Sequence, residues 1–155
     1  MHILAAALLI GVVAGLRTFT APAAVSWGAR LGPISLTGTH LAWLGSLIAA
    51  CIFTLLALFE IVFIDKNPKT PSRKSAQPFG ARIVSGAFSG AAIGLSGDPL
   101  WLGLLFGLVG AVIGTYGGAA LRGKLDAAFG KDLPAAITED AIAIIGAVLI
   151  VTCLA

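Results

Sequence analysis

Long apolar stretches separated by short polar ones run through the whole chain. Residues 41–64 contain one charged residue in 24 positions, Glu60, and residues 83–121 contain one in 39, Asp98. A helix that crosses a lipid bilayer needs about 20 apolar residues, and these stretches are long enough. The pattern therefore predicts an all-α integral membrane protein with about five transmembrane helices in a single transmembrane domain, residues 1–155. The predicted spans are residues 3–28, 41–64, 81–95, 100–121 and 134–154.

Polar residues interrupt the first predicted span. Its first half, Ile3–Leu16, is uniformly apolar, but Arg17, Thr20 and Pro22 follow. Proline inside a helix removes a backbone hydrogen bond and favours a kink or a break. We therefore predict that the first helix is kinked or broken near Arg17–Pro22. Either one kinked span, which we favour, or two half-helices in a re-entrant hairpin would satisfy this pattern.

Glycines recur at helical spacing in three of the predicted spans. Small residues allow the close backbone approach that drives helix association in lipid. The sequence therefore predicts glycine-rich helix packing, either inside one bundle or between copies in a homo-oligomer. A dimer is favoured, because five thin helices enclose little volume. The glycines concerned are Gly11, Gly15, Gly86, Gly90, Gly94, Gly103, Gly107, Gly110, Gly114 and Gly117.

Composition and charge agree with this pattern and add an orientation. The chain is 58% hydrophobic and 11% charged, with mean hydropathy +1.01, whereas soluble domains carry about 25% charged residues. Eight of the ten Lys and Arg fall within residues 66–82 and 122–131. Such residues concentrate on the cytoplasmic side of membranes, so we predict cytoplasmic loops at 65–80 and 122–133. The net charge of +3 then serves topology and contact with membrane lipids, and no nucleic-acid partner is expected.

The number of spans decides where the termini lie. Five spans place the N-terminus inside and the C-terminus outside, which we favour. A re-entrant first segment leaves four spans and places the N-terminus outside. Both arrangements keep the two basic loops on the cytoplasmic side.

Four carboxylates lie near predicted cytoplasmic helix ends: Glu60, Asp65, Glu139 and Asp140. If they converge, the cluster could hold a proton, Na⁺ or Mg²⁺. The alternative for Glu139 and Asp140 is helix capping, with Thr138 as the N-cap and the acids in the first turn. For Asp65, which lies beside Lys66, the alternative is a solvated loop position.

Arg17 is the only basic residue well inside a predicted span, about 21 Å of helix beyond Ile3. In the five-span arrangement it lies in the outer half of the bilayer. We expect it to extend to the interface, to bind Asp98, or to receive an anionic group through its planar fork. Arg82 and Arg122 are expected to anchor helices at the inner face. The sequence has no metal-ligand spacing and no nucleotide-binding loop, so no cofactor is predicted and a metal stays undetermined.

Several short segments, in this order and spacing, resemble a bacterial family of small polytopic membrane proteins known only as a domain of unknown function. The resemblance lies in Gly15-Leu-Arg-Thr-Phe-Thr-Ala-Pro22, in Phe59-Glu-Ile-Val-Phe-Ile-Asp-Lys-Asn-Pro68, in the glycine-rich segments and in Thr138-Glu-Asp-Ala-Ile-Ala143. It implies a multi-span helical fold in the bacterial cytoplasmic (inner) membrane. It also draws attention to Arg17, Glu60, Asp65, Lys66, Glu139 and Asp140, and it implies no activity.

Three functions are compatible with these features. The favoured one is a small transporter-like or channel-like protein, coupled to ions or protons through the carboxylate cluster. The second is a non-catalytic membrane scaffold or accessory subunit, in which charges only set topology and packing. The third is a Mg²⁺-dependent enzyme acting on a lipid phosphate, with acids holding the metal and basic residues the phosphate. A non-enzymatic role is favoured over the enzyme.

Overall fold

The computed structural model describes residues 2–64, 75–97, 99–130 and 132–154, and every regular element within these ranges is helical. The prediction of an all-α fold is therefore confirmed. By length and composition, α5 and the Leu133–Thr152 part of α6 could each cross a membrane, so two described helices meet that test instead of five. The elements are α1 (Ile3–Leu16), α2 (Thr20–Leu31), the 3₁₀ turn η1 (Ala42–Gly45), α3 (Leu47–Phe59), the π-helical segment η2 (Glu60–Ile64), α4 (Ala76–Gly94), α5 (Leu100–Phe129) and α6 (Asp132–Thr152).

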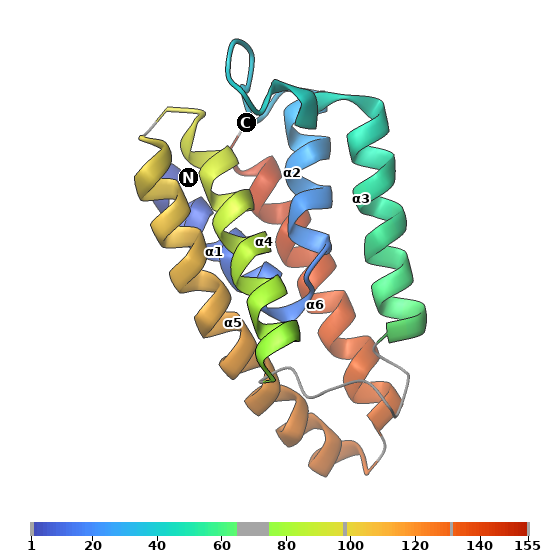
Figure 1. Ribbon diagram of the computed structural model, residues 1–155. Coiled ribbons are helices and arrows are strands. Elements are labelled where there is room, and N and C mark those ends of the chain that lie inside the picture. The colour runs from blue at the N-terminus through green and yellow to red at the C-terminus, as the bar shows by residue number, and fades with distance from the viewer. Residues whose placement is uncertain (1, 65–74, 98, 131, 155) are drawn as a thin grey trace.

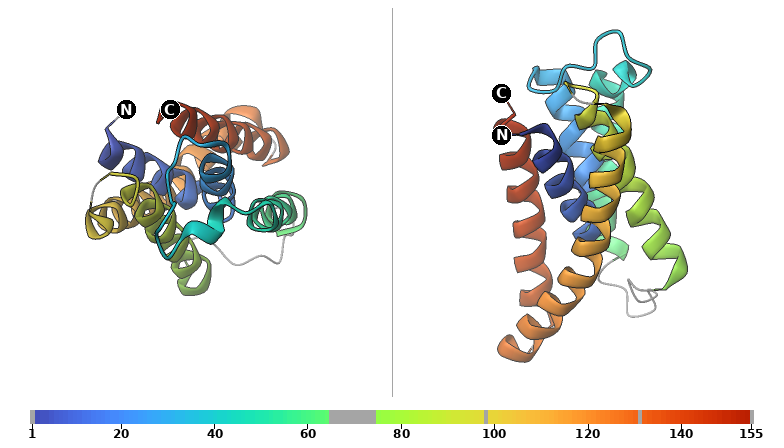
Figure 2. Two further views of the ribbon diagram at one scale, coloured as in Figure 1. Left: turned by 90° about the horizontal axis from the view of Figure 1, so that it is seen from above. Right: turned by 90° about the vertical axis from the view of Figure 1, so that its left-hand side faces the viewer.

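The first predicted span is in fact two helices that run in opposite directions. The chain leaves α1 at Leu16, turns back, and enters α2 at Thr20 (Figure 1). Both termini consequently lie at the same end of the bundle (Figure 2). The structure has the hairpin instead of the single kinked span, and the predicted placement of the termini on opposite faces is not found. Pro22 lies in the first turn of α2, where backbone N–H groups have no partner inside the helix and a proline is tolerated.

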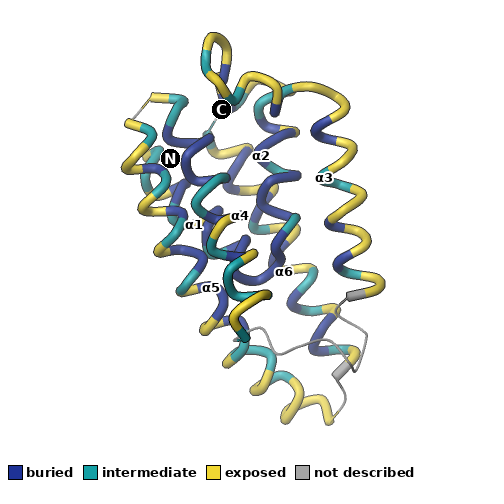
Figure 3. The backbone as a smooth tube through the Cα atoms, viewed as in Figure 1, coloured by how far each residue is buried: buried dark blue, intermediate teal, exposed yellow. Residues whose placement is uncertain are grey.

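Helix α1 is the buried centre of the bundle. Ala6, Ala7, Ile10 and Ala14 on this helix are fully buried, and Figure 3 shows buried backbone along α1 and its neighbours α2 and α4. It packs against α5, α4 and α6. Six of its fourteen residues are alanine or glycine, and such small residues allow neighbouring helices to approach closely.

Glycines make the close approach of α5 to α1 and α4 possible. A Cβ at Gly107 would collide with the carbonyl group of Gly86, and one at Gly110 would collide with the carbonyl oxygen of Leu8. Gly117, in contrast, has open space around it. Nine of the ten glycines noted in the sequence therefore face other helices of the same chain, while Gly117 does not.

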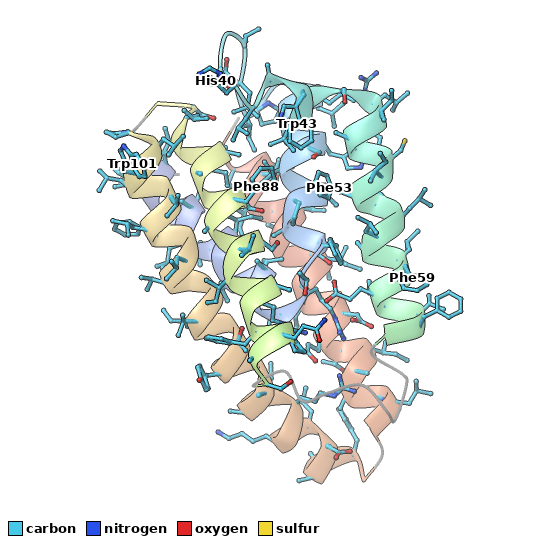
Figure 4. All side chains as sticks on the ribbon, in the orientation of Figure 1. His40, Trp43, Phe53, Phe59, Phe88 and Trp101 are labelled. Carbon is cyan, nitrogen blue, oxygen red and sulfur yellow. The ribbon has the colours of Figure 1, made fainter. Side chains whose placement is uncertain are left out.

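Helix α3 stands at the edge of the bundle and is held mainly by α2 (Figure 2). The indole of Trp27 on α2 donates a hydrogen bond to Thr54 Oγ1 at 3.0 Å. At the upper end, the rings of Trp43, Phe53 and Phe88 lie 6.2–6.4 Å apart and connect η1, α3 and α4 (Figure 4). The outer face of α3 is apolar and exposed, as for Ile48.

The helix boundaries differ from the predicted spans in ways that local chemistry explains. Helix α3 begins at Leu47 instead of residue 41, because the Ser46 side chain caps it by accepting from Ala49 N at 3.1 Å. Helices α4 and α5 extend into the two predicted loops, so residues 76–80 and 122–129 are helical. Helix α5 stops only at Gly130, whose φ of 65° suits a glycine at a helix C-terminus.

Candidate functional site

The break between α1 and α2 presents two peptide N–H groups to a single carboxylate. Thr18 N donates to Glu60 Oε1 at 2.9 Å, and Phe19 N donates to Glu60 Oε2 at 3.0 Å. These N–H groups precede the first turn of α2, where the helix dipole favours negative charge. The Glu60 side chain thus occupies the anion-binding position of a helix N-terminus.

Glu60 reaches this position from the end of α3, where it is the first residue of the π-helical segment η2. Its residue is 4% exposed. Arg82 on α4 approaches from another side, with Nη2 4.0 Å from Glu60 Oε1, and its Nη1 donates to Pro78 O at 3.4 Å. Because π-helical segments are rare and frequently occur at functional sites, the position of Glu60 in such a segment supports a functional role for this residue.

Arg17 projects from the same break toward α6. Its residue is fully buried, with Nε 2.5 Å from Asp140 Oδ1 and Nη2 3.8 Å from Glu139 Oε2. Arg122 on α5 reaches the same Glu139 oxygen, Nη1 to Oε2, at 3.6 Å. Buried charges are tolerated only when they are paired, so this grouping fixes the break against α5 and α6.

We call these six side chains the break network: Arg17, Glu60, Arg82, Arg122, Glu139 and Asp140. It contains three formal positive and three formal negative charges. Counting 1.5 Å per helical residue, Arg82, Arg122 and Glu139 lie about 9–11 Å inside the ends of their helices at Ala76, Phe129 and Asp132. These three helix ends belong to one end of the bundle, which we call the basic end because Arg82, Arg122 and Lys124 lie toward it. The network therefore lies about two helical turns inside the basic end, with Arg122 and Asp140 partly exposed and its other members buried.

The arrangement corrects the predicted acidic cluster. Glu60, Glu139 and Asp140 do gather around one break, but each lies beside an arginine or accepts from peptide N–H groups. Among the described residues, no group of three or more His, Cys, Asp or Glu side chains is placed to hold a metal ion. Asp65 lies outside the described residues.

Several other expectations also change. Arg17 pairs with acids of α6 and lies toward the basic end of the bundle, while Asp98 and Lys66 lie outside the described residues. Thr138 is not an N-cap: it lies inside α6 and its Oγ1 donates to Pro134 O at 2.8 Å. Glu139 and Asp140 are therefore beyond the first turn. Arg82 and Arg122, expected as surface anchors, point into the network.

Two features of the site were not anticipated from the sequence. Ser85 on α4 donates from Oγ to Thr18 O at 2.5 Å, which ties the break to α4. Thr20, the first residue of α2, is 7% exposed, and its buried Oγ1 has no hydrogen-bond partner among the described residues. The only feature of the sequence that could have pointed to Ser85 as a site residue is its hydroxyl side chain within a glycine-rich helix.

An apolar groove leads away from the network between α2, α3 and α6. Its volume is about 280 Å³. Thr20 and Ala23 line it from α2, Ala57 and Ile61 from the residues on either side of Glu60, and Val148 from α6. The groove thus reaches Thr20 at the N-terminus of α2 and Ile61, the residue that follows Glu60 in the chain.

Comparison with known proteins finds no matching family model, no matching curated protein and no matching solved structure. The resemblance to a family of small membrane proteins therefore stays a prediction.

Proposed function

We propose that this chain is a small multi-pass membrane protein of the transporter-like or channel-like kind, coupled to protons or ions through the break network. The observation that carries the proposal is the hydrogen bonding of Glu60 to the two peptide N–H groups of a broken helix inside the bundle. Many secondary transporters bind solutes at broken helices, where half-helix N-termini face anionic groups. Non-helical backbone at such depth is tolerated only when it is buried in protein or lines a cavity.

The same proposal includes an orientation. Helices α3 to α6 cross the bilayer of a bacterial inner membrane, α1 and α2 form a re-entrant hairpin, and the basic end faces the cytoplasm. Both termini then lie outside. The apolar face of α3, which is exposed in a single copy, faces lipid or a second copy in a homodimer. Leu55 at 65% exposure belongs to this face.

Flux measurements test the proposal directly. The full chain is reconstituted into liposomes that contain a pH-sensitive dye, and an inward proton gradient is imposed in the presence and absence of small organic anions. We expect the intact protein to dissipate the gradient faster than protein-free liposomes. Glu60→Gln and Glu139→Gln should reduce this flux at least tenfold, because each removes a charge from the break network.

The matched control is Asp126→Asn, an exposed acid near the end of α5, which should retain full flux. Unchanged flux in both Glu60→Gln and Glu139→Gln would overturn the transport proposal. So would the absence of any flux above protein-free liposomes for every ion and anion tried.

A second candidate function is a membrane scaffold or accessory subunit. The pairing of each network carboxylate with arginine or peptide N–H groups favours it, since such pairing needs no ligand to be satisfied. In that case, variants with neutralised acids that still fold should assemble with the protein's membrane partners as well as the wild-type chain does. Retained assembly together with absent flux would select this function.

A further inference from the structure

We propose that the N–H pair of Thr18 and Phe19 is a binding site for the carboxylate of an apolar monocarboxylate, which Glu60 occupies while no ligand is bound. On this view Glu60 takes up a proton when the ligand replaces it. The inference deepens the proposed function, on which it rests, by naming the substrate class and the coupled ion.

The geometry of the N–H pair is that of a carboxylate site. Each oxygen of Glu60 accepts from a different peptide N–H, at 2.9 Å from Thr18 and 3.0 Å from Phe19. Any carboxylate placed there would make the same two hydrogen bonds and would face Arg82, whose Nη2 is 4.0 Å from Glu60 Oε1. Charge-assisted bonds from peptide N–H groups to carboxylates are among the stronger ones in proteins.

An unsatisfied hydroxyl beside this pair points to a ligand as well. Thr20 follows Phe19 directly in the chain. Its exposed fraction is 7%, so the residue is 93% buried, and its Oγ1 has no hydrogen-bond partner among the described residues. Buried hydroxyls are normally hydrogen-bonded, because leaving one without a partner is unfavourable. Thr20 also lines the apolar groove. Because its Oγ1 is itself buried, the missing bond would come from a ligand oxygen that enters the break beside it and not from one that stays in the open groove.

The groove accounts for the apolar body of the ligand. Its lining is almost entirely carbon from alanine and branched side chains, such as Ala57, Ile61 and Val148, and its volume is about 280 Å³. This is near the lower end of the range of about 300–1,000 Å³ for small-molecule sites. A medium-length monocarboxylate therefore matches the site better than a large lipid or a strongly polar metabolite.

Charge balance within the bundle is the reason why a proton must enter together with the ligand anion. Glu60 faces Arg82 from α4 directly, and the other charged groups that the described part of the chain places around the break are Arg17, the α6 acids Glu139 and Asp140, and Arg122 from α5. These groups sum to zero formal charge. A second carboxylate would leave a net negative charge inside the bundle, where an uncompensated charge is costly. Protonation of Glu60 from water restores neutrality, so one ligand anion and one proton enter together.

Calorimetric titration of the full chain in lipid nanodiscs tests this, with octanoate as the probe and protein-free nanodiscs as the blank. Titrations at several pH values, in buffers of different ionisation enthalpy, give the number of protons taken up. We expect saturable binding with about one proton taken up per octanoate, and therefore an apparent Kd that rises about tenfold per pH unit. Octanol, which partitions into lipid but has no carboxylate, should not compete.

Variants separate the two parts of the site. Glu60→Ala frees the N–H pair, so we expect at least tenfold tighter octanoate binding at pH 8 and no proton uptake. Glu60→Gln keeps the side-chain volume and should show binding without proton uptake even if the alanine variant fails to fold. Val148→Trp should fill the groove and abolish binding, whereas Leu149→Trp, an equally exposed neighbour outside the lining, should not.

The results distinguish this inference from the proposed function. Unchanged affinity and proton uptake in both Glu60 variants would overturn the inference, as would equal competition by octanol, even if proton flux were observed. Glu60-dependent octanoate binding without any flux in liposomes would support the site and overturn the transport function.

Discussion

The guanidinium Nε of Arg17 lies 2.5 Å from Oδ1 of Asp140, which joins the break between α1 and α2 to the middle of α6. The arginine is fully buried. The backbone of the same break is held on its other side by Glu60 and by Ser85. A helix that stops inside a bundle leaves backbone groups without partners, and these side chains satisfy several of them.

Replacing Arg17 by methionine should destabilise the protein strongly. The change leaves Asp140 and Glu139 without one of their positive partners in a buried setting, and breaking a buried pair in this way costs about 3–5 kcal/mol. The measurement is unfolding of the detergent-solubilised chain by increasing amounts of denaturing detergent.

Arg30→Met is the matched control for this change, because Arg30 is exposed in the last turn of α2. It should alter stability by less than about 0.5 kcal/mol, as surface changes usually do. Equal losses in the two variants would contradict a structural role for the buried pair of Arg17 and Asp140.

Glu60→Gln should loosen the break locally without unfolding α1. The amide keeps one acceptor oxygen, so one of the two N–H groups at Thr18 and Phe19 loses its partner, at a cost of about 1–3 kcal/mol. Hydrogen exchange measured by mass spectrometry should accelerate in peptides that cover residues 17–20, while peptides around Ile10 stay protected. Uniform acceleration over both regions would show that the effect is global unfolding.

The apolar pattern was sufficient to predict the helical class and the place of the break. Arg17 and the polar residues after it interrupt an otherwise uniform run, and the structure ends α1 at Leu16. The pattern could not decide whether the chain continues or turns back, because hydropathy reports burial and not direction. It also ended the predicted span 100–121 too early, because Lys and Arg are as compatible with a helix as with a loop.

The pairing within the candidate site could not be predicted from the sequence, for a different reason. Glu60, Glu139 and Asp140 stood out as acids near apolar runs, and their gathering around one break follows from the fold. Their partners did not stand out, because Arg82 and Arg122 have the positions of ordinary membrane anchors. The peptide N–H groups that bind Glu60 carry no side-chain signal at all.

Thiol labelling should place the two termini on the same side of the membrane. In a background lacking Cys51 and Cys153, the single variants His2→Cys, Leu154→Cys and Lys124→Cys report the positions of the N-terminus, the C-terminus and the basic end. We expect a membrane-impermeant maleimide added to intact cells to label the first two and not the third. Labelling of Lys124→Cys after the cells are permeabilised confirms that this cysteine is reactive.

Labelling of Leu154→Cys but not His2→Cys would restore the arrangement with five spans. It would then contradict the hairpin formed by α1 and α2. Labelling of Lys124→Cys in intact cells would instead reverse the proposed orientation.

The glycines of α5 give a paired test of helix packing. A Cβ added at Gly107 would collide with the backbone of Gly86 and Gly90, whereas one added at Gly117 would meet nothing within 4 Å. Forcing extra atoms into a packed interior costs about 1–3 kcal/mol, while Gly→Ala in an open helical position gains about 0.5–1 kcal/mol. We therefore expect Gly107→Ala to unfold at a lower detergent fraction than wild type and Gly117→Ala to unfold at an equal or higher one. Similar destabilisation in both would mean that α5 does not pack through this glycine face, and the close contact between α4 and α5 would then be wrong.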